Sequence, residues 1–312
     1  MKKYILMALG IVLLSACSVL TPTAQNLKVC ESDEDRISGC IRERIDDNGD
    51  RFEIPYKNGE MNGIAKSYYT NGKLRGEIPH KNGKKDGVEK WYYENGKIEW
   101  ETSYKNGIKD GVEKSYYESG KLWNRTSYKQ GNEDGIARRY YENGVLESET
   151  SCKNGILDGV KKTYYRNGWI WSKVPYKNDK IDGIEKYYTN NGNLEIEIPY
   201  KNNVRDGIIK TYENGKLNNE LPFSNGKVVG IQKWYYESGE VQIKIPYKND
   251  KLNGDIEIYH KNGELAFILL CNKIKCANGK TLTTDESIVA ILNKLHEGFD
   301  KSFDEYINLC EN

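Results

Sequence analysis

Few residues of this chain combine types and spacing that could support catalysis or hold a cofactor. His296 and Glu297 begin an HExxH-like string, but Asp300 stands where zinc chemistry requires a second histidine on the same helical face. Residues 279–281, Gly-Lys-Thr, match the end of a phosphate-binding loop, but Ile274 stands where its first glycine is required. Both strings are incomplete, so neither predicts a site.

Asp46, Asn48 and Asp50 have the oxygen spacing that opens a calcium loop, but Arg51 replaces its glycine and Lys57 its bidentate acid. A polar turn is the better interpretation. Most other acids recur with the period of a solvated row, and the chain has only 3 histidines. We therefore expect no enzyme activity, no catalytic residue, no metal site and no cofactor.

The N-terminus has the pattern of an export signal. Lys2 and Lys3 precede an apolar run, residues 4–14, that is too short to span a bilayer permanently. Residues 14–17, Leu-Ser-Ala-Cys, resemble the lipobox of bacterial lipoproteins. We expect a lipoprotein signal peptide over residues 1–16, acyl chains such as palmitate on Cys17, and a linker to residue 38.

This processing places the protein in the cell envelope, anchored in a membrane and facing the periplasm or the cell exterior. An ordinary signal peptide with an incidental cysteine is the alternative. Cleavage removes two lysines, so that 45 of the 47 basic residues remain against 46 acidic ones. Such a balance does not favour nucleic acid as a partner.

Six further cysteines in an exported chain permit disulfides. Their clustering at the two ends suggests that Cys30 pairs with Cys40, and that Cys271 or Cys276 pairs with Cys310. Cys152 stands alone in the middle. The sequence does not fix the connectivity.

The main regularity of the sequence is the string YKNG or a variant of it. It recurs every 24 residues, except for one interval of 23, where KTYENG (210–215) has one tyrosine and KSYYESG (114–120) has two. The string begins at Tyr56, His80, Tyr104, Tyr128, Cys152, Tyr176, Tyr200, Phe223 and Tyr247. With a degenerate first unit that contains Gly39, there are about ten units.

Each unit contains two turns and two runs of strand length. In the unit that begins at Gly87, the turns are Glu94–Gly96 and Lys105–Gly107, and Asn-Gly is a strong hairpin signal because both residues tolerate positive φ. We call them the ENG turn and the KNG turn. The runs 88–93 and 97–104 between such turns predict antiparallel strands.

Apolar and polar residues alternate along the second run. We expect two apolar positions in this run, four residues apart, to share one buried face, with charged residues on the wet face. The first position holds Leu74, Ile98, Leu122, Leu146, Ile170, Leu194, Leu217, Val241 and Leu265. The second position holds Ile78, Thr102, Thr126, Thr150, Val174, Ile198, Leu221, Ile245 and Leu269.

One tyrosine of the first run keeps the same register in nine units. We expect its rings to stack across strands as the packing spine of the array. These residues are Tyr68, Tyr92, Tyr116, Tyr140, Tyr164, Tyr188, Tyr212, Tyr235 and Tyr259.

These patterns predict an all-β repeat array, an elongated single-layer antiparallel β-meander of about ten 24-residue hairpin repeats over residues 39–270. Ten units of two strands at about 4.8 Å per strand would extend roughly 95 Å. Residues 271–312 are expected to add a hairpin and an amphipathic helical cap, because a capping box at Thr283 precedes apolar residues at helical spacing.

Units such as residues 87–111, GVEKWYYENGKIEWETSYKNGIKDG, resemble the MORN-repeat variant of bacterial proteins, including the YwqK antitoxin-like family. The resemblance covers about residues 39–270 and implies a sheet of hairpins that serves as a contact surface. An antitoxin role would require a toxin partner outside the cytoplasm, because the chain carries an export signal.

Two surface features could bind a partner. Trp123, Trp169 and Trp171 fall on the nominally wet register, with Trp123 and Trp171 in the same slot two units apart. The lysine of YKNG forms a row that could bind anions, although an aspartate follows a few residues on in most turns. We expect a scaffolding surface for another protein, with a cell-envelope glycan or an antitoxin-like role as alternatives.

Overall fold

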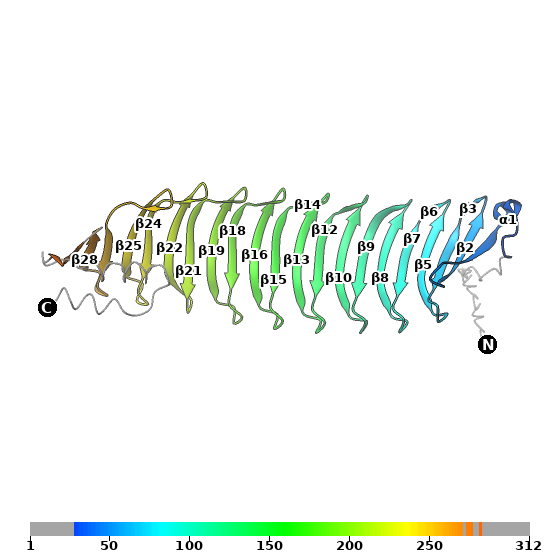
Figure 1. Cartoon of the computed structure of the whole chain (residues 1–312), viewed down its shortest axis with the longest axis horizontal. Helices are drawn as coiled ribbons and strands as arrows, with labels where there is room; N and C mark the ends of the chain where they lie inside the picture. Colours follow the sequence, from blue (N-terminus) through cyan, green and yellow to red (C-terminus); the bar gives the residue numbers. More distant parts are fainter. Residues whose placement is uncertain (1–27, 271–272, 277–280, 283–312) are drawn as a thin grey trace, which may run out of the picture.

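The computed structural model describes residues 28–270, 273–276 and 281–282, and these form one continuous sheet of 30 strands. The sheet is elongated, and its strands run across the long axis of the molecule (Figure 1). The signal peptide, Cys17, Cys271, Cys310 and the expected helical cap lie outside the described residues. Cys276 lies at the end of a described strand, Lys273–Cys276.

The strands fall into a few kinds. The first strands of the hairpins are β4 (Gly63–Tyr68), β7 (Gly87–Tyr92), β9 (Ile108–Tyr116), β12 (Gly135–Tyr140), β15 (Gly159–Tyr164), β18 (Gly183–Tyr188), β21 (Gly207–Glu213), β24 (Gly230–Tyr235) and β27 (Ile256–Tyr259). The second strands are β2 (Arg51–Lys57), β5 (Leu74–Lys81), β8 (Ile98–Lys105), β10 (Leu122–Lys129), β13 (Leu146–Lys153), β16 (Ile170–Lys177), β19 (Leu194–Lys201), β22 (Lys216–Ser224), β25 (Val241–Lys248) and β28 (Leu265–Leu270).

Short strands after the KNG turns extend the hairpins. They are β3 (Glu60–Met61), β6 (Lys84–Lys85), β11 (Asn132–Glu133), β14 (Ile156–Leu157), β17 (Lys180–Ile181), β20 (Val204–Arg205), β23 (Lys227–Val228) and β26 (Lys251–Leu252). The ends are β1 (Cys40–Ile45), β29 (Lys273–Cys276) and β30 (Thr281–Leu282).

Every strand pairs antiparallel with strands that are close in the sequence, for example β5 with β7 and β7 with β8. No strand among the described residues returns to a distant part of the sheet, so each unit contacts only its neighbours. This arrangement confirms the predicted all-β, single-layer meander with a 24-residue repeat.

The first edge of the sheet is covered by the residues that precede it. Helix α1 (Asp33–Ser38) begins with a capping box between Ser32 and Asp35. A disulfide joins Cys30 to Cys40, the pair that the clustering suggested. The Cys30 amide donates to the Ile41 carbonyl at 2.9 Å, so the preceding segment occupies part of the outer edge of β1.

Glycine begins most first strands for a steric reason. Gly183 has a φ of +122°, and a Cβ there would lie 3.0 Å from Cγ of Pro175 in the preceding unit. A side chain would therefore suffer both backbone strain and a close contact. Aspartate precedes this glycine in most units, and we call the position the DG glycine in every unit. The DG glycine lets consecutive units approach closely.

A β-bulge in the hairpins changes the face of one predicted position. In the unit of β4 and β5, Ser67 pairs with Gly76, whereas the next residue, Tyr68, pairs with Leu74. The extra residue of β5 reverses the alternation, so Leu74 lies on the face of Tyr68 and Ile78 lies on the opposite face. The prediction that these two apolar positions share one face is therefore wrong.

The two faces differ in burial. The face of Ile78 carries the buried side chains, which include Ser67 and Thr102, each 1% exposed, and Ile243, which is fully buried. We call it the buried face. The opposite face carries Tyr68 and a central line of charged residues, and we call it the charged face. A single layer has no second sheet, so the buried side chains are covered by their neighbours on the same face.

The tyrosines of the predicted spine lie on the charged face and act mainly through their hydroxyls. Tyr92 donates to Oε2 of Glu77 at 2.9 Å, and Tyr212 donates to Oε2 of Glu197 at 2.9 Å. None of the ring pairs found among the described residues joins two of these tyrosines. The expected stacking is not found, and six of the nine tyrosines form hydroxyl–carboxylate bonds instead.

The second tyrosine of each pair links adjacent units. Its hydroxyl donates to the backbone carbonyl of the first tyrosine in the next unit, 23 residues on. We call this bond the tyrosine staple. It joins Tyr69 to Tyr92, Tyr93 to Tyr116, Tyr117 to Tyr140, Tyr141 to Tyr164, Tyr165 to Tyr188 and Tyr236 to Tyr259, at 2.6–2.8 Å.

We predict that Tyr141→Phe lowers the free energy of unfolding by about 1 kcal/mol, because it removes one part-buried hydrogen bond between units. Urea denaturation followed by circular dichroism measures the change. Tyr188→Phe is the matched control, because the Tyr188 hydroxyl has no hydrogen-bond partner among the described residues. Equal effects of the two substitutions would contradict the assigned role of the staple.

Candidate interaction surface

A line of charged side chains runs along the middle of the charged face. Each member is the cross-strand neighbour of the next, and we call the line the charged row. It consists of Glu53, Lys66, Glu77, Lys90, Glu101, Lys114, Arg125, Arg138, Glu149, Lys162, Lys173, Lys186, Glu197, Lys210, Glu220, Lys233, Lys244 and Glu257.

Some of the opposite charges that are adjacent in the row form ion pairs. Lys114 lies 2.7 Å from Glu101, and Lys186 lies 2.7 Å from Glu197. Each such pair is partly exposed and contributes at most about 1 kcal/mol. The pairs therefore order the side chains of the face more than they stabilise the sheet.

Two stretches of the row hold three cations in succession. They are Lys114, Arg125 and Arg138 in one stretch, and Lys162, Lys173 and Lys186 in the other. The outer members of each stretch pair with glutamates. The central Arg125 and Lys173 form no ion pair with the described residues, so each leaves an unbalanced positive charge on the charged face.

Several carboxylate and phenol groups of this face have shifted pKa values. The hydrogen bond from Lys186 is the largest influence on Glu197; burial opposes it, and a hydrogen bond from Tyr212 adds to it, so the pKa of Glu197 is lowered. Burial and the bond to Glu197 raise the pKa of Tyr212 from 10.0 to about 12. The face therefore keeps anionic glutamates beside neutral tyrosines over a wide pH range.

An exposed apolar line runs parallel to the charged row. It is formed by the residue that follows the DG glycine, which lies on the charged face two residues before a lysine or arginine of the row in most units. We call this line the aliphatic stripe. Its exposed members are Ile64 (53% exposed), Val88 (43%), Ile136 (37%), Val160 (40%), Ile184 (49%), Ile208 (46%) and Ile231 (48%).

Proline or serine of the second strand completes the stripe. Ile184 pairs with Pro199, Ile208 with Pro222, and Ile231 with Pro246. Val88 pairs with Ser103 instead. The C-terminal half of the stripe is therefore the more apolar half. An exposed apolar line of this kind is a candidate contact surface.

The aliphatic stripe was not predicted from the sequence, although a signal for it was present. A β-branched aliphatic residue follows the DG glycine in unit after unit, for example Val160 and Ile184. No face was predicted for this residue from the sequence, and an exposed strand position is usually polar. Its repeated apolar character was the signal.

The three tryptophans that the sequence analysis singled out are exposed and lie near the ENG turns. Trp123 and Trp171 occupy the bulge position of β10 and β16, with 41% and 45% exposure. Trp169 lies in a turn rather than in a strand and is 54% exposed.

Each tryptophan ring packs against a neighbouring residue. The ring centroids of Trp123 and Tyr117 are 6.3 Å apart, and those of Trp171 and Tyr187 are 5.7 Å apart. A Cβ at Gly192 would lie 2.5 Å from the Trp169 ring, so that ring covers the next turn. The tryptophans are thus partly used within the array, and they lie away from the aliphatic stripe.

The lysines of the KNG turns are exposed, and the aspartates near them bind backbone groups. Asp86 accepts the amide of Asn106 at 3.1 Å, and Asp134 accepts that of Asn154 at 3.1 Å. These aspartates connect one turn to the next. They also place a negative charge beside each lysine, which weakens the turn edge as an anion-binding surface.

The described residues contain no group of three or more His, Cys, Asp or Glu side chains that could hold a metal ion. No helix in the same residues is long and apolar enough to cross a membrane. The Asp46 carboxylate accepts the amides of Asn48 and Asp50 at 3.0 Å each, as in a polar turn. Asp50 also forms an ion pair with Arg75.

The geometry defines an open, single-layer array of β-hairpins. Seven segments match the model of the MORN repeat variant: residues 61–82, 85–106, 109–130, 133–154, 157–178, 181–202 and 228–249. The chain is therefore a MORN-variant repeat protein. The interval 203–227, which includes the short unit, has no match.

No curated protein matches the chain in sequence. Among solved structures, TarM shares 18% identity at a TM-score of 0.23, over 36% of this chain and 22% of that one. The complex TcdB2-TccC3-Cdc42 shares 12% identity at a TM-score of 0.20, over 77% and 17%. A porin-like protein from Bacteroides uniformis shares 11% at 0.20, over 78% and 92%.

This chain thus spans about a fifth of the TarM length. The TM-scores are too low for these likenesses to bear on fold or function.

The raised tyrosine pKa values predict a two-phase alkaline titration. Tyr92 and Tyr212 have pKa values raised to about 12, chiefly by burial and then by bonds to Glu77 and Glu197. A phenol whose pKa is raised on folding adds stability that is complete below the ordinary value of 10.0 and is lost as the pH rises toward 12. Tyrosinate absorbance in native and urea-unfolded protein measures both phases.

Glu197→Gln should move part of the late phase to lower pH, because it removes the carboxylate beside Tyr212. A native titration that coincides with that of the unfolded chain would contradict these assignments.

Proposed function

We propose that the protein is a non-enzymatic lipoprotein of the cell envelope whose repeat array serves as a scaffold for another protein. The observation that carries this proposal is the aliphatic stripe beside the charged row. A partner protein with an apolar ridge flanked by charges of both signs would match this surface.

The stripe is suited to protein binding because it combines apolar area with fixed polar neighbours. Ile184 and Ile208 are 49% and 46% exposed and lie in adjacent units, beside prolines of the second strands. Apolar side chains supply the binding energy, and neighbouring charges set the register and exclude wrong partners. Because the pattern repeats with each unit, an elongated partner could make the same contact several times.

Membrane anchoring would orient this surface in the envelope. The lipobox-like residues 14–17 support cleavage before Cys17 and acylation of that residue. Several acyl chains hold a protein far more firmly than one, at about 0.8 kcal/mol per buried methylene. The array would then extend from the anchor at its N-terminal end.

We expect the double variant Val160→Asp and Ile184→Asp to weaken partner binding about tenfold or more, because it places unpaired charges in an apolar contact. The measurement is photo-crosslinking in intact cells from a probe at position 136, followed by identification and quantification of the crosslinked protein. Stability should change little, since both residues are at least 40% exposed.

Ile156→Asp is the matched control, because Ile156 is also 40% exposed but lies in β14 at the turn edge, off the stripe. Crosslinking that survives the double variant, or is lost equally in the control, would argue against the stripe as the binding surface.

Cys17→Ser should abolish incorporation of an alkyne-labelled palmitate and release the protein from the membrane fraction. The reason is that serine cannot accept the thioether-linked lipid. Labelling that persists in Cys17→Ser would refute the anchor, and Cys152→Ser serves as the control for other cysteines.

The tryptophans support a second candidate, a module that binds a cell-envelope glycan. Trp169 is 54% exposed at a turn, where it could stack on a sugar ring. Under this candidate, Trp123→Ala with Trp171→Ala abolishes retention on purified envelope polymer and leaves protein crosslinking unchanged. A YwqK-like antitoxin role is the particular case in which the protein partner is a toxin.

A further inference from the structure

Two junctions of the array lack the tyrosine staple that six others contain. Thr189 replaces the tyrosine at one of them, and the residue is missing altogether at the other. In the unit of β21 and β22, Tyr212 keeps the position of Tyr92, because its hydroxyl binds Glu197 as that of Tyr92 binds Glu77. Glu213 follows directly, where the regular unit has Tyr93 before Glu94. The missing residue is therefore the tyrosine of the staple, and its loss accounts for the 23-residue interval.

The deletion also tightens the turn. Glu213 pairs directly with Lys216, so only Asn214 and Gly215 connect the strands, both at positive φ. In the regular unit, the Tyr93 amide donates to the Lys97 carbonyl at 2.9 Å, and three residues, 94–96, connect the two strands. The tip of the short hairpin therefore ends earlier than the tips beside it.

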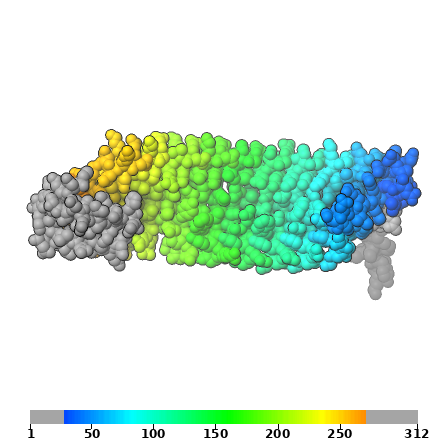
Figure 2. All heavy atoms as spheres, in the orientation of Figure 1, coloured from blue at the N-terminus to red at the C-terminus, as the bar shows by residue number. Residues whose placement is uncertain are grey.

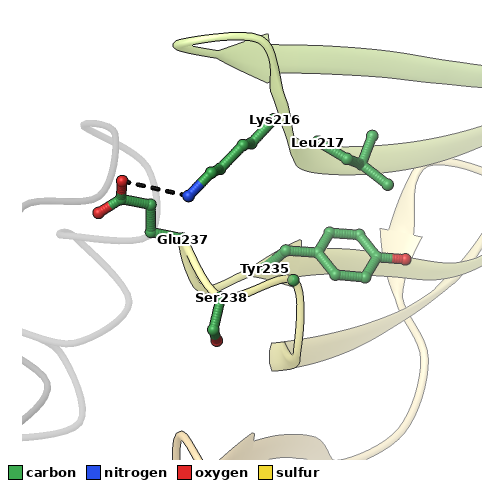
Figure 3. A pocket seen from close by; sticks show the side chains of 6 residues that line it. Lys216, Leu217, Tyr235, Glu237 and Ser238 are labelled. Carbon is green, nitrogen blue, oxygen red and sulfur yellow. Dashed lines mark hydrogen bonds and ion pairs between the residues drawn. The ribbon is translucent and has the colours of Figure 1, made fainter.

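A hollow of about 350 Å³ lies between this short tip and the next one. It is bordered by Lys216 and Leu217 of β22, by Tyr235 at the end of β24, and by Glu237, Ser238 and Gly239 of the turn that follows (Figure 3). Lys216 and Glu237 form an ion pair of 3.4 Å at its rim.

The regular junctions show what fits between two such tips. Tyr93 reaches from its own tip to the carbonyl of Tyr116, the residue that corresponds to Tyr235. The turn that follows Tyr116 includes Glu118 and Ser119. Their backbone carbonyls accept hydrogen bonds from the side chains of Asn95 and Lys97, which belong to the tip of Tyr93. Thus the residues around the hollow correspond to those that surround a tyrosine staple elsewhere.

We propose that this hollow is a recognition site for a tyrosine side chain of the partner protein. The phenol ring of the partner enters between the tips and its hydroxyl donates to the Tyr235 carbonyl, as the staple does in regular units. The inference rests on the proposed protein-binding function and names the side chain that the array recognises. Because the deletion occurs in one of the described units, the partner would be recognised at one place along the array.

The site is tested with N-acetyl-tyrosinamide as the probe on the full mature chain. Saturation-transfer NMR gives its dissociation constant, and the methyl resonances of Leu217 report the location. N-acetyl-phenylalaninamide should bind about fivefold more weakly, because it lacks the hydroxyl that donates one neutral hydrogen bond.

Insertion of a tyrosine between Tyr212 and Glu213 restores the regular string YYENGK and should fill the hollow. We expect at least tenfold weaker probe binding together with a higher free energy of unfolding, which shows that the variant is folded. Insertion of a serine at the same point is the matched control; it restores the spacing without the ring and should retain binding.

No binding of the probe, or equal binding to the tyrosine-insertion variant, would overturn the proposal. None of these outcomes affects the crosslinking test of the aliphatic stripe, so the failure of this site and the failure of the proposed function are distinguishable.

Discussion

Contact between neighbouring units is the constraint on which this structure depends. A single-layer sheet has no second layer to enclose a core, so each hairpin must be held by the hairpins on either side. Backbone pairing supplies part of this contact, and the tyrosine staple supplies a further bond at the end of the hairpin. The rod shape follows directly (Figure 2), because contacts that are made only between sequence neighbours extend in one direction.

Much of the fold could be predicted from the sequence because its signals repeat. The Asn-Gly turns and the constant interval locate the strands, and an error in one unit is corrected by the others. The side-chain faces were harder to predict. The bulge beside Tyr68 adds one residue to β5, and nothing in the alternation of Leu74 and Ile78 indicates that the two positions are separated by an irregular step.

The candidate surface was predicted less well, for a related reason. A tryptophan at a position predicted to face solvent is a candidate contact residue even in a single unit, and Trp123 and Trp171 are indeed exposed. The residue after the DG glycine is an ordinary valine or isoleucine in any one unit, and only the three-dimensional register shows that these residues form a line. The staple had a visible signal, the tyrosine pair, but its acceptor is a backbone carbonyl that no side-chain pattern reveals.

The staples are not distributed evenly along the rod. Thr189 replaces the stapling tyrosine in one unit and uses its hydroxyl inside its own turn, and the next unit lacks the residue altogether. Two successive junctions are therefore held by fewer bonds than those before and after them. In a linear array, mechanical strain concentrates at the most compliant joints, so bending or tension would be absorbed near residues 189–235 while the stapled segments move as stiff levers.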